Sequence, residues 1–296
     1  MIRILVTIFA GLLGMAFGSF LNVCLSRWPA GESIVRPRSH CRHCNRTLAW
    51  WENVPLLSWL ALRGRCRTCR AWIGWRYPLV ELAVGGLWAR QTWEYISDQN
   101  LDILVFNFSH TLHSPERLIC LVGLFVFPWI LVALAVLDAE TLWLPNWLTL
   151  PGILMGYICT VSQVRIIYDM ERTPPLTLGL LGGFYPIIAA AALILLIRWL
   201  YWLIRRREGI GLGDAKLMAL LAAWLGLPGA LLSFGIGIVL GALVAIVLLI
   251  VPSARRASET WATSKLPLGT FLCIGGIVSS LWGQPILSAY LRWAGF

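Results

Sequence analysis

Long apolar runs recur along the whole chain, and they constrain its fold more than any other feature. A helix that crosses the roughly 30 Å hydrocarbon core of a bilayer needs about 20 mostly apolar residues. Eight runs bounded by charge, proline or glycine approach this length, at 2–25, 78–96, 117–137, 145–164, 176–204, 215–228, 229–251 and 267–290. The sequence therefore predicts an all-α polytopic membrane protein with about eight transmembrane helices.

Composition excludes a water-soluble globular protein. Of the 296 residues, 58% are hydrophobic and 13% are charged, whereas soluble domains carry about 25% charged residues. The net charge of +10 is dispersed in short segments between the apolar runs rather than along one polar face. This pattern argues against nucleic acid as a partner and for a lipid bilayer.

Two of the predicted spans have alternatives. The first run opens with Arg3 like a secretory signal, but it lacks a small-x-small cleavage site and an arginine-rich segment follows it, so a retained helix is expected. The short run 215–228 continues through Pro228 into the next run. This pair is therefore either two helices or a half-helix followed by a tight turn.

Basic residues predict the topology, because cytoplasmic loops carry the excess of Lys and Arg. The segment 26–77 holds ten arginines against Glu32 and Glu52, a net charge of +8, and is expected in the cytoplasm. Alternation across eight helices then places the basic segments 205–207 and 255–265 on the same side. Both termini are expected on the opposite side.

Two aspartates lie at the predicted cytoplasmic edge of the membrane. Asp138 ends the third apolar run, and Asp214 follows a glycine-rich segment between the fifth and sixth runs. Two carboxyl groups that approach to about 3 Å cannot both ionise, so they share a proton. One then activates a water while the other protonates the scissile carbonyl, which is peptide hydrolysis without a metal. The two aspartates are the candidate catalytic residues.

The neighbours of Asp214 fit this chemistry. Gly211 and Gly213 lack a Cβ, so an extended substrate backbone can approach them closely. Lys216 can favour the ionised carboxylate or hold a carbonyl in place. The alternative is that each aspartate only caps or ends a helix. A nucleotide-binding loop is disfavoured, because no strand precedes the glycines and no Gly-Lys-Ser/Thr follows.

The segment 26–77 also contains two C-x-x-C units separated by 21 residues. Their members are Cys41, Cys44, Cys66 and Cys69. Cytoplasmic thiols stay reduced, so four converging thiolates predict a tetrahedral, structural Zn²⁺ site that folds this loop. A redox pair is the alternative. His40 and His43 can each replace a ligand, although four cysteines complete the shell.

Further motifs follow in order along the chain, at 18–23, 36–39, 53–58, 76–82, 144–146 and 211–216. Together with the cysteine units, they make the chain resemble the bacterial prepilin peptidases, or type IV leader peptidases, over nearly its whole length. The resemblance implies that Asp138 and Asp214 are catalytic at the cytoplasmic face of the bacterial inner membrane, with both termini in the periplasm. The implied substrates are type IV prepilins or type II secretion pseudopilins, from which the leader is hydrolysed.

The resemblance also implies a second activity. Many family members methylate the new N-terminal amine with S-adenosylmethionine, and this function is associated with the N-terminal part. Residues 1–96, with the first two helices and the zinc loop, are therefore expected to be the methyltransferase part, and residues 97–296 the aspartyl peptidase core. No residue pattern identifies an S-adenosylmethionine site independently, since no strand-linked dinucleotide-type motif is present.

Two features stand apart from the central motifs. Glu140 and Asn146 occupy positions where acidic residues are frequent in relatives, which leaves Asp138 as the one aspartate of its motif. Glu81 lies inside the second predicted helix, and it is expected to face the bundle interior, either in support of the site or as a helix-packing hydrogen bond.

Two rival functions keep the same fold. A membrane scaffold or transporter would use the zinc loop to recruit a cytoplasmic partner. An intramembrane aspartyl protease of eukaryotic type would share a Gly-x-Gly-Asp loop, but its pattern does not include the paired C-x-x-C units.

Overall fold

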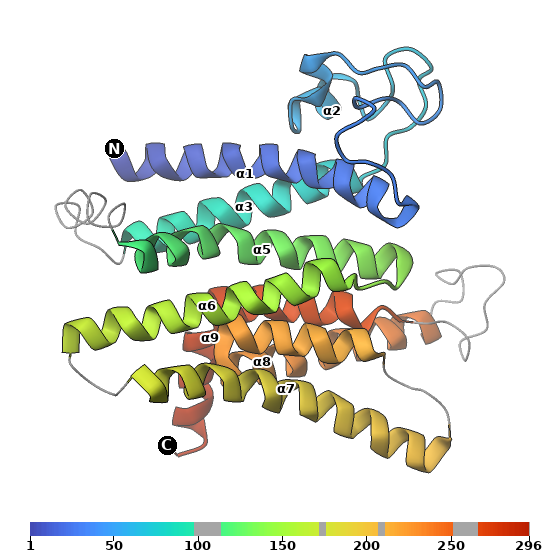
Figure 1. Cartoon of the computed structure of the whole chain (residues 1–296). Helices are drawn as coiled ribbons and strands as arrows, with labels where there is room; N and C mark the ends of the chain where they lie inside the picture. Colours follow the sequence, from blue (N-terminus) through green and yellow to red (C-terminus); the bar gives the residue numbers. More distant parts are fainter. Residues whose placement is uncertain (98–113, 172–175, 207–210, 251–265, 296) are drawn as a thin grey trace. The chain divides into compact units, whose positions relative to one another are not determined.

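The computed structural model describes residues 1–97, 114–171, 176–206, 211–250 and 266–295. Within these ranges the regular structure is helical, and the only extended pairings are two isolated β-bridges, His40 with Thr47 and Arg65 with Trp72. The predicted all-α class is thereby confirmed (Figure 1).

The long helices follow the predicted apolar runs. They are α1 (Ile2–Arg27), α3 (Arg76–Ser97), α5 (Pro115–Thr141), α6 (Asn146–Glu171), α7 (Leu176–Arg205), α8 (Leu212–Ile250) and α9 (Leu268–Trp293). Three short helical turns, η1 (Trp28–Ala30), η2 (Trp50–Asn53) and α2 (Leu57–Ala61), lie in the chain between α1 and α3.

The predicted number of eight spans is not confirmed. In the described parts of the chain, six helices are long and apolar enough to cross a membrane, and α3 is not among them. Helix α3 contains charged side chains among its apolar ones. Glu81 is one of them, and Arg90 forms an ion pair with Glu94, one helical turn further along α3. The 22 residues of α3 are long enough to cross a bilayer, but its mixed composition keeps it out of this set, so its span stays a prediction.

Helix α8 contains both the sixth and the seventh predicted runs. Its 39 residues would make a straight helix of about 59 Å, roughly twice the hydrocarbon thickness. The helix is interrupted at Gly226, whose φ of 68° and ψ of 178° are accessible mainly to glycine. The break that the sequence suggested at Pro228 lies two residues earlier.

The chain forms two compact units. The first contains residues 1–97 and the middle of α5, residues 124–133. The second contains both ends of α5 together with α6 to α9. Helix α5 therefore contributes to the packing of both units.

In the first unit, α1 and α3 cross through glycine contacts. A Cβ on Gly18 would lie 2.8 Å from the Cα of Glu81, and a Cβ on Gly85 would lie 2.9 Å from the carbonyl oxygen of Gly11. Such close approach increases the van der Waals contact between the two helices. In lipid this contact drives helix association, because apolar side chains gain little free energy by moving from lipid tails to a helix interface.

In the second unit, α8 packs against α6, α7 and α9. Its first half is deeply buried, and Leu217, Met218 and Leu220 have no exposed surface. Trp224 adds a hydrogen bond from Nε1 to the carbonyl oxygen of Gly152 in α6, at 2.9 Å. The start of α8 is therefore held firmly among its neighbours.

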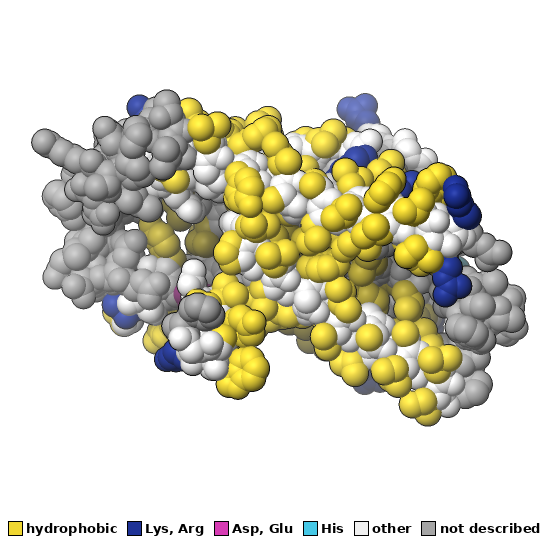
Figure 2. Space-filling model, turned by 90° about the horizontal axis from the view of Figure 1, so that it is seen from below, with side chains coloured by type: hydrophobic (Ala, Val, Ile, Leu, Met, Phe, Trp, Pro, Cys, Tyr) yellow, Lys and Arg dark blue, Asp and Glu magenta, His cyan; other side chains and the backbone are white. Residues whose placement is uncertain are grey.

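The outward faces of the long helices are apolar. Phe9 of α1 is 66% exposed and Leu181 of α7 is 70% exposed. Figure 2 shows hydrophobic side chains over most of one face, with Lys and Arg toward its margins. Apolar surface on this scale is incompatible with water and suits lipid tails, so the chain is a multi-pass membrane protein.

The crossing of α1 and α3 gives a stability prediction. Gly85→Ala should lower the stability of the first unit by about 1–3 kcal/mol, because the added Cβ meets the backbone of α1. Its neighbour Gly86 has nothing within 4 Å of a Cβ, so Gly86→Ala is the matched control and should be neutral or slightly stabilising. Thermal unfolding of the purified variants in detergent measures the difference. Equal midpoints would contradict the close crossing.

Candidate active site and metal centre

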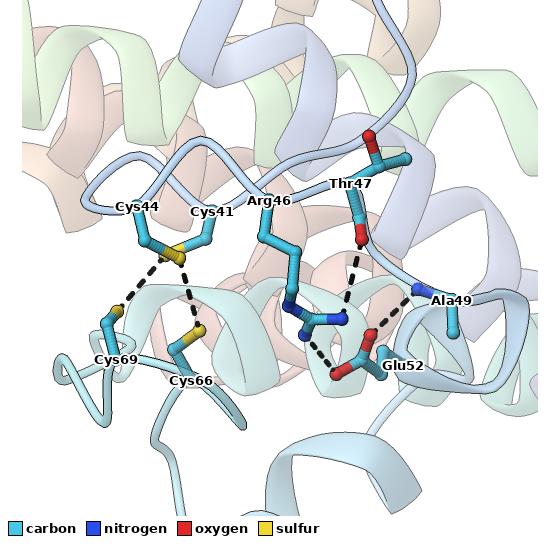
Figure 3. A network of polar contacts seen from close by, with 8 residues as sticks. All are labelled: Cys41, Cys44, Arg46, Thr47, Ala49, Glu52, Cys66 and Cys69. Atoms are coloured by element: carbon cyan, nitrogen blue, oxygen red, sulfur yellow. Dashed lines mark hydrogen bonds and ion pairs between the residues drawn. The ribbon is translucent and has the colours of Figure 1, made fainter.

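The four cysteines of the two C-x-x-C units converge. Their sulfur atoms all lie within 4.8 Å of one another. The Sγ atoms of Cys41 and Cys69 are 3.7 Å apart, and those of Cys44 and Cys66 are 4.0 Å apart (Figure 3). Thiolates about 2.3 Å from a tetrahedral zinc ion would be separated by about 3.8 Å. The spacing of the sulfurs therefore fits a metal ion with four protein ligands.

The nearby histidines do not belong to this cluster, which consists of the four cysteines. The Nδ1 atom of His40 lies 3.1 Å from the carbonyl oxygen of Arg38. His43 is exposed. The described geometry thus favours a shell made of thiolates alone.

Both C-x-x-C units form the same tight turn, which the sequence analysis did not anticipate. The amide of Asn45 donates to the carbonyl oxygen of Cys41 at 2.8 Å, and the amide of Arg70 donates to that of Cys66 at 3.0 Å. Asn45 and Arg70 each have a positive φ, of 53° and 56°. A β-bridge between residues seven positions apart closes each turn. The metal centre is therefore built from two similar halves.

Backbone amides in the second turn favour the metal-binding form of a cysteine. Hydrogen bonds from the amide of Cys69, and then from that of Thr68, lower the pKa of the Cys66 thiol to about 6. Because the thiolate is the form that coordinates metals, Cys66 is prepared for a metal ion, whereas burial and the neighbouring thiols raise the pKa of Cys69 to about 11.

A partly buried ion pair stabilises the first turn. Arg46 donates from Nη2 to Oε1 of Glu52 at 2.6 Å, and the amide of Ala49 donates to the other carboxylate oxygen at 2.7 Å (Figure 3). The hydrogen bond from Arg46 lowers the pKa of Glu52. The Glu52 side chain is only 2% exposed, so loss of Arg46 would leave a buried carboxylate without its charge partner.

Glu81 fastens the cysteine loop to α3. It is 6% exposed, and its Oε2 accepts a hydrogen bond from the amide of Leu56 at 2.8 Å. Ser19 of α1 also donates to this carboxyl. Glu81 belongs to the first unit, whereas Asp138 and Asp214 belong to the second. The contacts of Glu81 are those of a structural anchor.

Asp138 lies one turn before the end of α5 and is 5% exposed. Its Oδ2 accepts a hydrogen bond from the amide of Thr270 at 2.7 Å, and the Thr270 hydroxyl lies 3.2 Å from the same oxygen. Thr270 is in the first turn of α9, so the positive end of that helix faces the carboxylate. A Cβ on Gly269 would lie 2.9 Å from Asp138 Cγ, and only glycine therefore permits this approach.

Asp214 lies in the first turn of α8 and is partly buried. Its Oδ2 accepts a hydrogen bond from the amide of Gly211 at 3.2 Å. An acid in the third helical position that reaches back in this way caps the helix. One oxygen of Asp214 therefore caps the start of α8, which is the alternative that the sequence left open.

Lys216 points to a different partner. Its Nζ donates to Oδ1 of Asn146, the first residue of α6, at 2.6 Å. The lysine therefore links α8 to α6 one helical turn or less from Asp214.

The two aspartates lie in the same unit, close enough for their charges to interact. The Cδ1 atom of Leu144 is 3.1 Å from the Cβ position of Gly213 and 3.2 Å from that of Gly269. Leu144 therefore touches both glycines that stand beside the aspartates. Cys273, which has no exposed surface, is within range of both carboxylate charges. The end of α5 and the starts of α8 and α9 thus meet in one place.

Sequence analysis did not single out Gly269 or Thr270. Thr270 is 132 positions from the aspartate that it contacts. The one available signal was that a Gly-Thr pair follows Pro267 at the start of the last apolar run. Small and polar residues in a first helical turn are too common to indicate a site.

These observations define a class: a multi-pass helical membrane protein with a four-cysteine cluster that could hold a metal ion and two acidic residues at helix ends. Within that class, the chain belongs to the type IV leader peptidase family, whose model matches residues 125–246. The bacterial peptidase A24 N-terminal domain matches residues 12–95. The family resemblance seen in the sequence is thereby confirmed.

Curated relatives named prepilin leader peptidase/N-methyltransferase match almost the whole chain. One from Stutzerimonas stutzeri is 32% identical over 305 residues, covering 95% of this chain and 92% of the relative. One from Pseudomonas aeruginosa is 31% identical, covering 96% and 93%. One from Myxococcus xanthus is 35% identical, covering 90% and 69%. No solved structure matches the chain.

The sulfur cluster predicts a metal content. The purified protein should hold about one metal ion per chain, and Cys66→Ser should lose it because a four-ligand site without one thiolate binds far more weakly. Cys120→Ser, which alters a half-buried thiol of α5 outside the cluster, is the control and should retain the ion. Elemental analysis by mass spectrometry measures the metal content of the wild type and of both variants. A Cys66→Ser variant with wild-type metal content would contradict the assignment.

Proposed function

We propose that the chain is an aspartyl prepilin peptidase that removes the leader from type IV prepilins or type II secretion pseudopilins and then methylates the new N-terminus. The observation that carries the peptidase half is that Asp138 and Asp214 lie at helix ends of one compact unit, each bound by a backbone amide. Relatives named prepilin leader peptidase/N-methyltransferase, which match nearly the whole chain, support both halves.

The chemistry follows from two carboxyl groups that compete for one proton. The ionised partner takes a proton from a water whose oxygen bonds to the scissile carbonyl carbon, while the protonated partner donates to the carbonyl oxygen. The C–N bond then breaks, the leaving amine takes the proton gained from the water, and the carbonyl re-forms and returns the other proton. The positive ends of α8 and α9 lie beside these groups, where they stabilise negative charge. Asp214 therefore has a dual role in this proposal, in which one oxygen caps α8 and the carboxyl takes part in the proton exchange.

The site suits a substrate that is part leader and part membrane helix. The basic loop 26–77 and the aspartates face the cytoplasm in this proposal, and both termini face the periplasm. The leader then stays in water while the apolar segment that follows it lies in lipid, so the scissile bond reaches the membrane edge. Gly211 and Gly213 leave room there for an extended backbone.

The metal in this proposal is zinc with a structural role, because four thiolates leave no position for a substrate or water. S-adenosylmethionine would supply the methyl group for the second reaction. The first unit, with the cysteine loop, is the proposed place of that reaction, whereas leader hydrolysis belongs to the second unit.

The aspartates give the direct test. Asp138→Asn and Asp214→Asn should each slow cleavage of a purified prepilin by roughly 10²- to 10⁴-fold, since each removes one partner of the proton exchange. Glu140→Gln changes an exposed acid two positions after Asp138 and should cleave at the wild-type rate. Mass spectrometry of the substrate's mature N-terminus reports cleavage and methylation together. An intact precursor with the wild-type protein would instead favour the scaffold or transporter.

Thr270 is a positioning residue that can be tested with a conservative pair. Thr270→Val removes the hydroxyl that lies beside Asp138 and should slow cleavage about tenfold, as expected for a lost hydrogen bond to a charged group. Thr270→Ser keeps the hydroxyl and should restore most of the rate. The kcat of leader cleavage by both variants is the measurement. Equal losses in the two variants would indicate a packing role for the methyl group instead.

A further inference from the structure

The short connection between α5 and α6 is fixed at both ends. Leu142 ends α5 with a positive φ of 53°, and its amide donates to the carbonyl oxygen of Asp138 at 2.9 Å. At the other end Pro145 is buried, and its carbonyl oxygen accepts a hydrogen bond from the amide of Thr149 in the first turn of α6, at 3.0 Å. The backbone that carries Leu144 is therefore held in place from both sides.

The side chain of Leu144 lies between the starts of two helices. Its Cδ1 atom is 3.1 Å from the Cβ position of Gly213 and 3.2 Å from that of Gly269. Gly213 is the second residue of α8, and Gly269 is the second residue of α9. Both distances are shorter than the usual 3.5–4.0 Å between carbon atoms in contact, so the leucine fills the space that each glycine leaves.

We infer that Leu144 is a positioning residue that sets the separation between the carboxyl groups of Asp138 and Asp214. This inference rests on the peptidase half of the proposed function. A displacement of about 1 Å in a catalytic arrangement can slow a reaction by roughly 10²-fold. A side chain that fixes the distance between two carboxyl groups therefore controls the rate without touching the substrate.

The contact with α8 reaches Asp214 through one peptide bond. Gly213 directly precedes Asp214, and the carboxyl of Asp214 is held by the amide of Gly211 at 3.2 Å. A second link joins the same parts of the chain, because Nζ of Lys216 donates to Oδ1 of Asn146 at 2.6 Å. The first turn of α8 is therefore tied to the connection by an apolar contact and by a hydrogen bond.

The contact with α9 reaches Asp138 through hydrogen bonds. Gly269 directly precedes Thr270, whose amide donates to Oδ2 of Asp138 at 2.7 Å. A Cβ on Gly269 would lie 2.9 Å from Cγ of Asp138 and 3.2 Å from Cδ1 of Leu144. Leu144 thus packs against the backbone that carries one carboxyl group and against the backbone that binds the other.

This role predicts a signature in the pH dependence of cleavage. Two carboxyl groups that share one proton give a bell-shaped dependence of kcat on pH, and the bell widens as their interaction strengthens. Truncation of Leu144 would leave the starts of α8 and α9 without their common contact. The carboxyl groups would then interact less strongly, and the bell would become narrower.

Cleavage of a purified prepilin by the full-length protein, measured across the pH range, tests the inference. Leu144→Ala should lower kcat about 10- to 100-fold and narrow the bell, with KM within about twofold of the wild type because the substrate contacts are unchanged. Leu144→Val removes one methylene and should act in the same direction more weakly, and it serves if Leu144→Ala does not fold. Leu144→Met keeps the length of the side chain and should restore most of kcat and of the width.

Leu221→Ala is the matched control for a structural effect. It makes the same truncation in α8, two helical turns after Asp214, at a side chain with no exposed surface. The cavity that it leaves should lower the thermal midpoint in detergent. The width of its bell and its KM should equal those of the wild type.

The outcomes separate the inference from the proposed function. Wild-type kcat and bell width in both Leu144→Ala and Leu144→Val would overturn the inference, and so would a loss confined to KM or an equal narrowing in Leu221→Ala. The proposed function would stand in each case if Asp138→Asn and Asp214→Asn still lost cleavage. Wild-type cleavage by those two variants would overturn the function and the inference together. Narrowing in Leu144→Ala with recovery in Leu144→Met would support the inference.

Discussion

The absence of water from the hydrocarbon core is the constraint on which the rest of this structure depends. Every backbone amide and carbonyl inside the bilayer must be paired within the protein, and helices satisfy this requirement. The amides that a helix leaves unpaired are those of its first turn. The starts of α8 and α9 therefore offer hydrogen-bond donors, which Asp214 and Asp138 accept. The same constraint that makes the fold helical thus creates places where acidic side chains are stable.

The first unit is stabilised by other interactions. Lipid offers no hydrophobic driving force for helix association, so α1 and α3 rely on glycines that bring their backbones together. The loop between them carries eight arginines, and its main aromatic contact is a cluster of Trp59, Trp72 and Trp75. Binding of a structural metal contributes about 10–16 kcal/mol in small zinc-binding peptides. Here the two similar turns, the Arg46–Glu52 ion pair and Glu81 stabilise the loop together with this tryptophan cluster.

The sequence predicted what depends on local pattern. Apolar runs located the helices, because the requirement for apolar length acts on consecutive residues. The C-x-x-C spacing located the metal cluster for the same reason. The mixed composition of α3 leaves its predicted span unconfirmed, and the break at Gly226 was placed near Pro228 because proline is the more visible interruption. The contact between Thr270 and Asp138 joins residues 132 positions apart, and no local pattern encodes it. The sequence likewise named Glu81 without showing that it binds the amide of Leu56.

A cavity of about 650 Å³ beside α1 and α3 has two cysteines of the cluster, Cys41 and Cys66, in its wall. A metal ion held by the four sulfurs would fix these two side chains, so any coupling between the metal ion and a ligand in the cavity would be reciprocal. Asp138 and Asp214 belong to the other compact unit. In the proposed bifunctional enzyme, a shortage of metal would therefore act on the first unit and leave the surroundings of the two carboxyl groups unchanged.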